Sequence, residues 1–220
     1  KELAVIAEKI KTEGLMLYHS EKASWIGTDM LLARHADMSN LGGYFSYHDG
    51  AFTRCVFYTK NEKPSVAYSI SFDSTFLPGK AIADSQPRPF TETEQTFYLL
   101  RKATLDTIEK ENDDFTVYKQ TKYNIVPILN NDNKYVYVIT ASTDDGAITY
   151  GNDYLLRFDT GMHITDIEKL HKGLIKMEMK DPKRNMNAAI HTHLPGYSPF
   201  VTPTDICTAM LYQDICGAKT

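Results

Sequence analysis

The residues best suited to chemistry lie in one segment near the end of the sequence, AAIHTHLPGYSPFVTPTDICTAM (188–210). The segment reads as HxH, a loop rich in proline and glycine, and then TxxD. Residues two apart on a β-strand point to the same side of a sheet, so His191 and His193 share one face of the strand that AAIHTHL predicts. Two imidazoles on one face can bind a single metal ion.

The TxxD part predicts the start of a helix. Thr202 suits the N-cap, Pro203 suits the first helical position, and Asp205 falls in the first turn, where the helix dipole favours a negative charge. We expect this structural role whether or not a metal is bound. If the Asp205 carboxylate also faces the two histidines, the three side chains supply the ligand number of a catalytic zinc site and leave a fourth position open for water.

The combination of HxH, a turn-rich loop and TxxD resembles the signature of the JAMM zinc metalloproteases. These deubiquitinase-like hydrolases, which have prokaryotic relatives, carry HxH, a short loop and SxxD. The resemblance covers residues 188 to about 214. It implies that His191, His193 and Asp205 bind zinc, and that Thr202 takes the place of the family's serine in stabilising the oxyanion. It also implies hydrolysis of peptide or isopeptide bonds, with a peptide or protein as substrate.

A zinc hydrolase needs a general base to take the proton of the metal-bound water, and in this family the base is a glutamate on an earlier strand. The chain contains no glutamate between Glu111 and Glu168. Glu13 lies between a predicted helix and a short apolar stretch, which is similar to the setting of the family's glutamate, and it is the first candidate for a catalytic residue. Glu21, Glu168 and Glu178 stay open as alternatives.

A second hypothesis is a relative without activity that keeps the scaffold and acts as a binding module, at the cell envelope or within a larger assembly. A glutamate within one water's reach of the metal position distinguishes the two hypotheses. The sequence shows no phosphate-binding glycine loop, dinucleotide fingerprint or nucleophile elbow, so zinc is the only cofactor that it indicates. Glu168 and His171 share a face only if their segment is helical, and its alternating pattern favours a strand.

Composition and charge argue against further classes of protein. Twenty-four Lys and Arg face twenty-eight Asp and Glu, the net charge is −4, and the basic residues are scattered, which argues against nucleic-acid binding. No apolar run approaches the ~20 residues of a membrane helix. The sequence begins at Lys1 without an initiator Met, so we expect that an upstream segment was removed, either by a choice in cloning or because it was a signal or anchor; in the second case the protein is exported or periplasmic. Cys55, Cys207 and Cys216 form no CxxC pair and are expected to be buried free thiols.

The elements that must position these residues follow from hydrophobic periodicity. Helical spacing in ELAVIAEKIK (2–11) gives way to an apolar strand or turn in EGLMLYHS (13–20), and Ser20 then caps a second helix that places Trp25 in the core. Next, GGYFSYHDGAFTRCVFYTK (42–60) predicts a hairpin that turns at Asp-Gly, and PSVAYSISFD (64–73) predicts a third strand.

The second half of the chain begins with its best-marked helix. Thr91 and Glu94 form a capping box ahead of QTFYLLRKATLDTIEKE (95–111), with Phe97, Leu100, Thr104 and Ile108 on one face. An antiparallel meander follows, then the strand at 188–194 and a C-terminal helix; the meander strands are YNIVPIL, KYVYVITAS, AITYG, YLLRFD and HITDIEKLHKGLIKMEM. We therefore expect an α+β fold with a large antiparallel sheet and N-terminal, central and C-terminal helices. Its parts would be residues 1–85 and 86–220, or one continuous domain.

Overall fold

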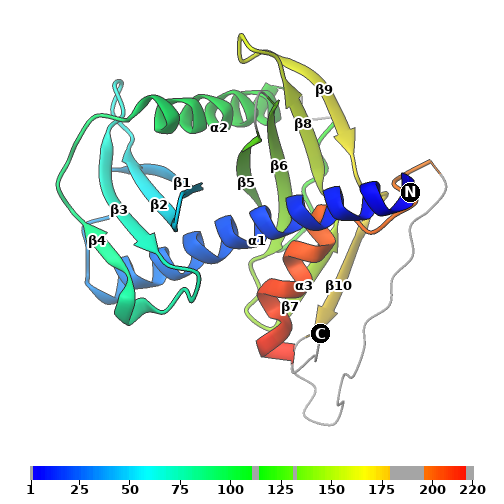
Figure 1. Cartoon of the computed structure of the whole chain (residues 1–220), viewed down its shortest axis with the longest axis horizontal. Coiled ribbons are helices and arrows are strands. Elements are labelled where there is room, and N and C mark those ends of the chain that lie inside the picture. The colour runs from blue at the N-terminus through cyan, green and yellow to red at the C-terminus, as the bar shows by residue number, and fades with distance from the viewer. Residues whose placement is uncertain (1, 111–113, 131–132, 179–195, 217–220) are drawn as a thin grey trace. The chain divides into compact units, whose positions relative to one another are not determined.

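The computed structural model describes residues 2–110, 114–130, 133–178 and 196–216, with side chains to residue 213 in the last helix. The fold is α+β, as predicted, with helices near the N-terminus, in the centre and near the C-terminus, together with antiparallel sheets (Figure 1). The chain forms two compact units. We call His19–Arg101 the N-terminal unit, and Lys1–Tyr18 with Lys102–Thr220 the C-terminal unit.

The first helix, α1 (Glu2–Ala33), is continuous. The prediction of a strand or turn at 13–20 between two helices was therefore wrong. The stretch has no proline, and in a helix its Leu17 and Tyr18 side chains reach the core together, at 0% and 7% exposure. The prediction that Trp25 is a core residue was also wrong, because Trp25 is 41% exposed while Ala23 on the same helix is fully buried.

The N-terminal unit holds a four-stranded antiparallel sheet. Its strands, in spatial order, are β1 (Leu41–Asp49), β2 (Phe52–Thr59), β3 (Val66–Phe72) and β4 (Ile82–Asp84), with a short 3-10 helix, η1 (Pro78–Lys80), before β4. The predicted hairpin is confirmed, and Gly50 at its turn has a φ of 62°. Cys55 and Phe57 pack with Ala23 and Leu31 of α1, so the second part of α1 covers one face of this sheet.

The central helix, α2 (Glu92–Lys110), begins as its sequence predicts. The backbone N–H of Thr91 donates to Glu94 Oε2 at 2.9 Å, and the backbone N–H of Glu94 donates to Thr91 Oγ1 at 3.2 Å. This reciprocal pair is a capping box. Phe97, Leu100 and Thr104 of the predicted face are buried. The helix contributes residues to both units.

The C-terminal unit holds the predicted meander strands in two groups. One sheet has the order β5 (Thr121–Asn130), β6 (Asn133–Ser142), β8 (Tyr154–Phe158) and β9 (Ile164–Lys169), and a separate pair consists of β7 (Ala147–Gly151) and β10 (Leu174–Glu178). Gly151 and Asn152 have φ values of 85° and 56°, which turn the chain sharply between β7 and β8. The predicted strand at 188–194 lies outside the described residues.

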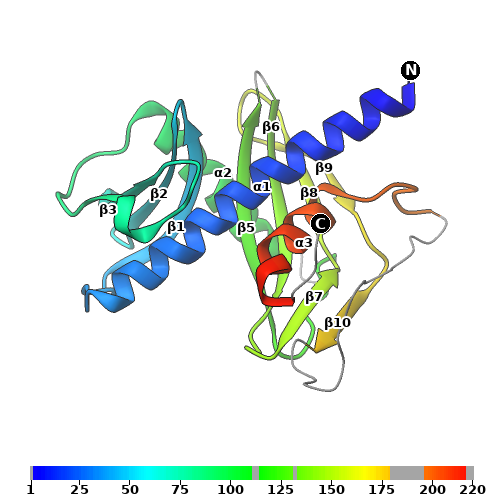
Figure 2. The ribbon, with the colours of Figure 1, turned by 60° about the horizontal axis from the view of Figure 1, so that its bottom comes forward.

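One face of the larger sheet packs on two helices, the first part of α1 and the last helix, α3 (Pro203–Cys216) (Figure 2). Leu17 and Tyr18 of α1 and Cys207 of α3 share a core cluster with Val126, Ile128, Tyr137, Ile139, Leu155 and Leu170. Gly14 permits the close approach of the helices, because a Cβ there would lie 2.7 Å from Cβ of Ile206.

Two smaller predictions can be checked in the part of the chain that the structure describes. Cys55 and Cys207 are buried free thiols, as expected, whereas the side chain of Cys216 lies outside the described residues. No helix in the described ranges is long and apolar enough to cross a membrane.

Candidate functional site

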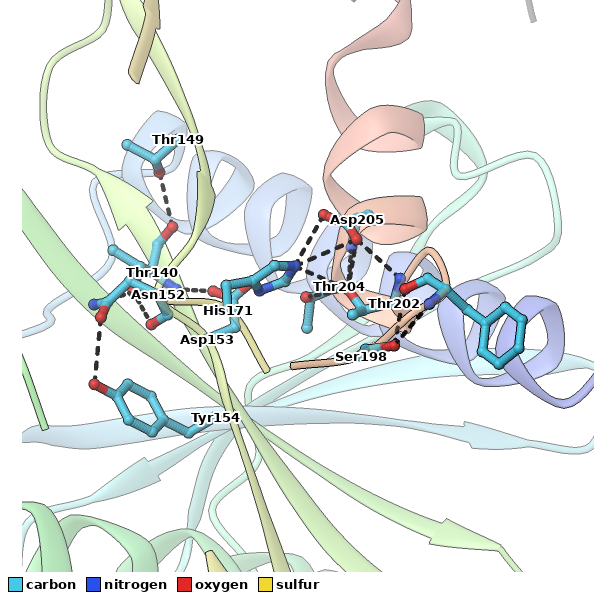
Figure 3. Close-up of polar contacts among 11 residues, drawn as sticks. Thr140, Thr149, Asn152, Asp153, Tyr154, His171, Ser198, Thr202, Thr204 and Asp205 are labelled. Atoms are coloured by element: carbon cyan, nitrogen blue, oxygen red, sulfur yellow. Dashed lines mark hydrogen bonds and ion pairs between the residues drawn. The ribbon is translucent and has the colours of Figure 1, made fainter. Parts of the chain in front are cut away.

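The start of α3 carries two of the predicted site residues (Figure 3). The Asp205 carboxylate accepts hydrogen bonds from the backbone N–H of Thr202 at 2.9 Å and from the Thr202 hydroxyl at 2.8 Å. The backbone N–H of Asp205 donates in return to Thr202 Oγ1 at 3.2 Å. The two residues thus form a capping box, and Pro203 is the first helical residue. The prediction that this segment begins a helix is confirmed.

His171, from the segment between β9 and β10, lies against this helix start. Its Nε2 atom is 3.4 Å from both carboxylate oxygens of Asp205, and its Nδ1 atom is 3.5 Å from Oδ2 of Asp153. The imidazole therefore lies between two carboxyl groups, as Figure 3 shows. All three residues are buried, with at most 9% exposure. We call Asp153, His171, Thr202 and Asp205 the α3 network.

Backbone and hydroxyl groups hold Asp153 in place. Its Oδ1 atom accepts from the backbone N–H of Thr140 at 2.8 Å, and its carbonyl oxygen accepts from the backbone N–H of Leu170 at 2.8 Å. The Thr140 hydroxyl donates to the carbonyl of Asn152 at 2.7 Å, and the Asn152 amide donates to the carbonyl of Thr116 at 2.7 Å. The network thereby ties β6 and the start of β8 to α3.

The charges in the α3 network depend on one another. Burial raises the pKa of Asp153 to about 7, although the Thr140 N–H and the charge of His171 oppose this shift. Burial by itself would lower the pKa of His171, but the hydrogen bond to Asp205 and the charges of both aspartates outweigh it and raise that pKa. Burial is likewise outweighed at Asp205, where His171 and Thr202 hold the pKa well below its usual range. The Asp153 carboxyl group, with its pKa raised to about 7, therefore changes charge near neutral pH.

The predicted zinc site is only partly within the described residues. Asp205 is buried and faces an imidazole, but this imidazole belongs to His171. His191 and His193 lie outside the described residues. In the part of the chain that the structure describes, no three His, Cys, Asp or Glu side chains are grouped so that they could hold a metal ion. Zinc binding by His191, His193 and Asp205 stays a prediction.

Glu13, the predicted catalytic base, lies on the first part of α1 and is only 6% exposed. The Tyr137 hydroxyl donates to Glu13 Oε2 at 2.6 Å. Burial and the charge of Glu13 raise the pKa of Tyr137 far above its usual range, so the hydroxyl keeps its proton and acts as the donor. The Glu13 Oε1 atom is 4.0 Å from Nζ of Lys9, which is too long for a direct hydrogen bond. Among the described residues, no hydrogen bond or ion pair joins Glu13 to the α3 network.

Glu13 lines a groove between the first part of α1 and the ends of four strands, β5, β6, β8 and β9, all in the C-terminal unit. We call it the Glu13 groove. Its volume is about 770 Å³, and its lining consists of Val5, Glu8, Lys9, Thr12, Glu13, Asn130, Asn133, Lys134, Tyr135, Arg157, Phe158 and Thr165. Arg157 is already paired with Asp166 and with Glu168, the latter at 2.8 Å. The groove therefore combines one buried carboxylate with walls of mixed polar and apolar character.

The side chains predicted to act together have different partners in the structure. Thr202 and Asp205 meet at the start of α3, whereas the contacts of Glu13 are with Tyr137 and Lys9. Sequence reasoning missed the partners of Asp205. His171 was set aside because its segment alternates, and Asp153 was not a candidate. Nothing in their spacing indicates that 153, 171 and 205 meet, because the meeting depends on how the strands pair.

Comparison with known proteins gives no match to a family model, a curated protein or a solved structure.

Proposed function

We propose that this chain is a binding module that takes a small polar ligand in the Glu13 groove. The observation that carries the proposal is the Glu13 carboxylate, which is almost fully buried and yet lines an open groove. Burying a charged group is costly unless other groups compensate it. A ligand that interacts with Glu13 would supply this compensation.

The size and walls of the groove support binding. Small-molecule sites commonly have volumes of roughly 300–1,000 Å³, and the volume of about 770 Å³ lies within that range. Thr12, Asn130, Asn133 and Thr165 line it, and their hydroxyl and amide groups can both donate and accept hydrogen bonds. Such groups suit a polar ligand better than an apolar one.

The described residues favour binding over hydrolysis. The side chains of the α3 network are buried and bonded to one another, and none of them lines the Glu13 groove. Zinc-dependent hydrolysis of peptide or isopeptide bonds, the activity implied by the JAMM resemblance, stays a prediction that rests on His191 and His193.

A variant that fills the groove tests the binding function. Thr12 is exposed on α1 and lines the groove, so Thr12→Trp should occupy the space without disturbing the core. Leu3→Trp is the matched control, since Leu3 is 68% exposed on the same helix and does not line the groove. We expect a ligand-observed NMR screen of cationic, neutral and anionic fragments to find binders of the wild type. These fragments should no longer bind Thr12→Trp and should still bind Leu3→Trp. A screen without such fragments would overturn the proposal.

A further inference from the structure

The chain contains another buried carboxylate on a helix, and the negative charge of this carboxylate is compensated by donors within the protein. Glu94, in the N-terminal unit, is 0% exposed. Arg88 donates to both of its oxygens, at 2.6 and 2.7 Å. The Thr91 backbone N–H and the Tyr47 hydroxyl add two further hydrogen bonds, at 2.9 and 3.2 Å. A guanidinium cation and two neutral donors therefore balance this carboxylate inside the protein.

Glu13 is buried almost as deeply and has much less compensation. Its one hydrogen bond among the described residues comes from the neutral Tyr137 hydroxyl, which binds Oε2. The nearest cation is the ammonium of Lys9, 4.0 Å from Oε1 on a side chain that is 71% exposed. A carboxylate offers about four acceptor positions, so Glu13 retains acceptor capacity on the side of the groove. The missing component, relative to Glu94, is a cation in direct contact.

We propose that the ligand of the Glu13 groove carries a primary ammonium group, which donates hydrogen bonds to the Glu13 carboxylate. This inference rests on the proposed binding function and names the chemical class of its ligand. A primary ammonium carries three N–H donors, so it can bind the acceptor positions of Glu13 that the Tyr137 hydroxyl leaves free. A bound ammonium would give Glu13 the direct contact with a cation that Arg88 gives Glu94.

The remaining charges favour a ligand with a single ammonium group. Lys9 and Lys134 also line the groove, whereas the one other lining carboxylate, Glu8, is paired with Lys11, so a second positive charge on the ligand would meet net repulsion. Arg157 cannot attract a ligand anion strongly, because Asp166 and Glu168 already balance its charge. The polar part of the ligand is then bound by the neutral hydroxyl and amide groups of the lining. The groove therefore fits a small polar monoamine.

Two probes of the same charge separate hydrogen bonding from simple charge attraction. Ethanolamine carries a primary ammonium, whereas choline carries a quaternary ammonium without an N–H donor. We expect NMR titration of the wild type to give an affinity for ethanolamine at least about tenfold higher than for choline, the usual contribution of one charge-assisted hydrogen bond. The diamine putrescine should bind no more tightly than ethanolamine. This comparison needs no variant, so it does not depend on the folding of one.

Two variants locate the effect. Glu13→Gln keeps the shape and can still accept from Tyr137, so it should weaken ethanolamine binding by at least about tenfold. Glu8→Gln removes one negative charge from an exposed residue of the same groove, and solvent screening should keep its effect below about threefold. No ethanolamine binding, equal affinities for both probes, or unchanged affinity in Glu13→Gln would each overturn the inference. Neutral or anionic fragments that bind the wild type but not Thr12→Trp would overturn it while the proposed binding function stands.

Discussion

The α3 network and the Glu13 groove both contain buried carboxyl groups of the C-terminal unit. The charges of these groups are compensated differently in the two regions. In the network, one imidazole serves two aspartates, and backbone N–H and hydroxyl groups supply the remaining donors. In the groove, Glu13 has one neutral donor and an exposed ammonium at 4.0 Å. The charges of the α3 network are balanced by opposite charges within the protein, whereas the incomplete compensation of Glu13 beside a groove supports the proposed binding.

Removing a carboxylate charge should therefore have different effects in the two regions. Removing a charge from the α3 network should reduce stability or change its dependence on pH, because the network is compensated internally. Removing the charge of Glu13 should affect binding and leave stability almost unchanged. Residues that bind ligands are often not the residues that would maximise stability.

The largest effect is expected from Asp153→Asn, as a change in the pH dependence of stability. The pKa of Asp153 is about 7 in the folded chain and about 4 in an unfolded one. A raised carboxyl pKa stabilises the fold fully below pH ~4, and this contribution is lost as the pH rises towards 7. The free energy of unfolding of the wild type minus that of Asp153→Asn should therefore fall by roughly 2–4 kcal/mol as the pH rises from ~4 to ~7. Urea unfolding at several pH values measures it.

The control for this pH profile is Asp114→Asn, which changes an exposed aspartate of the same unit. Its profile should run parallel to that of the wild type. His171, whose pKa is also raised, makes the wild type lose further stability above pH ~6.5, in the same direction. Parallel profiles for wild type and Asp153→Asn would show that Asp153 does not titrate as the burial of its carboxyl group implies.

A smaller effect is expected from Asp205→Asn, and it also tests the zinc prediction. Asparagine can still accept from the Thr202 N–H, but the imidazolium of His171 loses a carboxylate, so the free energy of unfolding should fall by about 1–3 kcal/mol. Thermal melts with zinc and with a chelator measure the change. We expect the loss to be the same in both conditions. A wild type that zinc stabilises, with a variant that does not respond, would make Asp205 a metal ligand and favour the hydrolase.

Local signals in the sequence predicted local structure well. The capping boxes at Thr91 and Glu94 and at Thr202 and Asp205 were predictable because donor and acceptor lie three residues apart. The Asp-Gly hairpin turn was predictable for the same reason. The fold class followed from the many alternating apolar segments and the capped helices between them.

Contacts distant in the sequence were not predictable. Glu13 was chosen because it precedes an apolar stretch that looked like a strand, yet this stretch is helical, and the partner Tyr137 is 124 residues away. Similarly, His171 meets Asp153 because β8 pairs with β9, which sets Tyr154 opposite Lys169, and Asp205 joins them from α3, 34 residues further along the chain. Alternation fixes which face a residue occupies but not which strands become neighbours.

The central claim, that Glu13 is buried for a ligand and not for the fold, is tested most directly by the stability of Glu13→Gln without ligand. Glutamine keeps the hydrogen bond from Tyr137 and removes a costly buried charge, so the free energy of unfolding from urea titration should stay within about 1 kcal/mol of the wild type or rise above it. A loss of more than about 2 kcal/mol, the size expected when a paired buried charge is removed, would show that Glu13 belongs to the structural framework and would contradict the account.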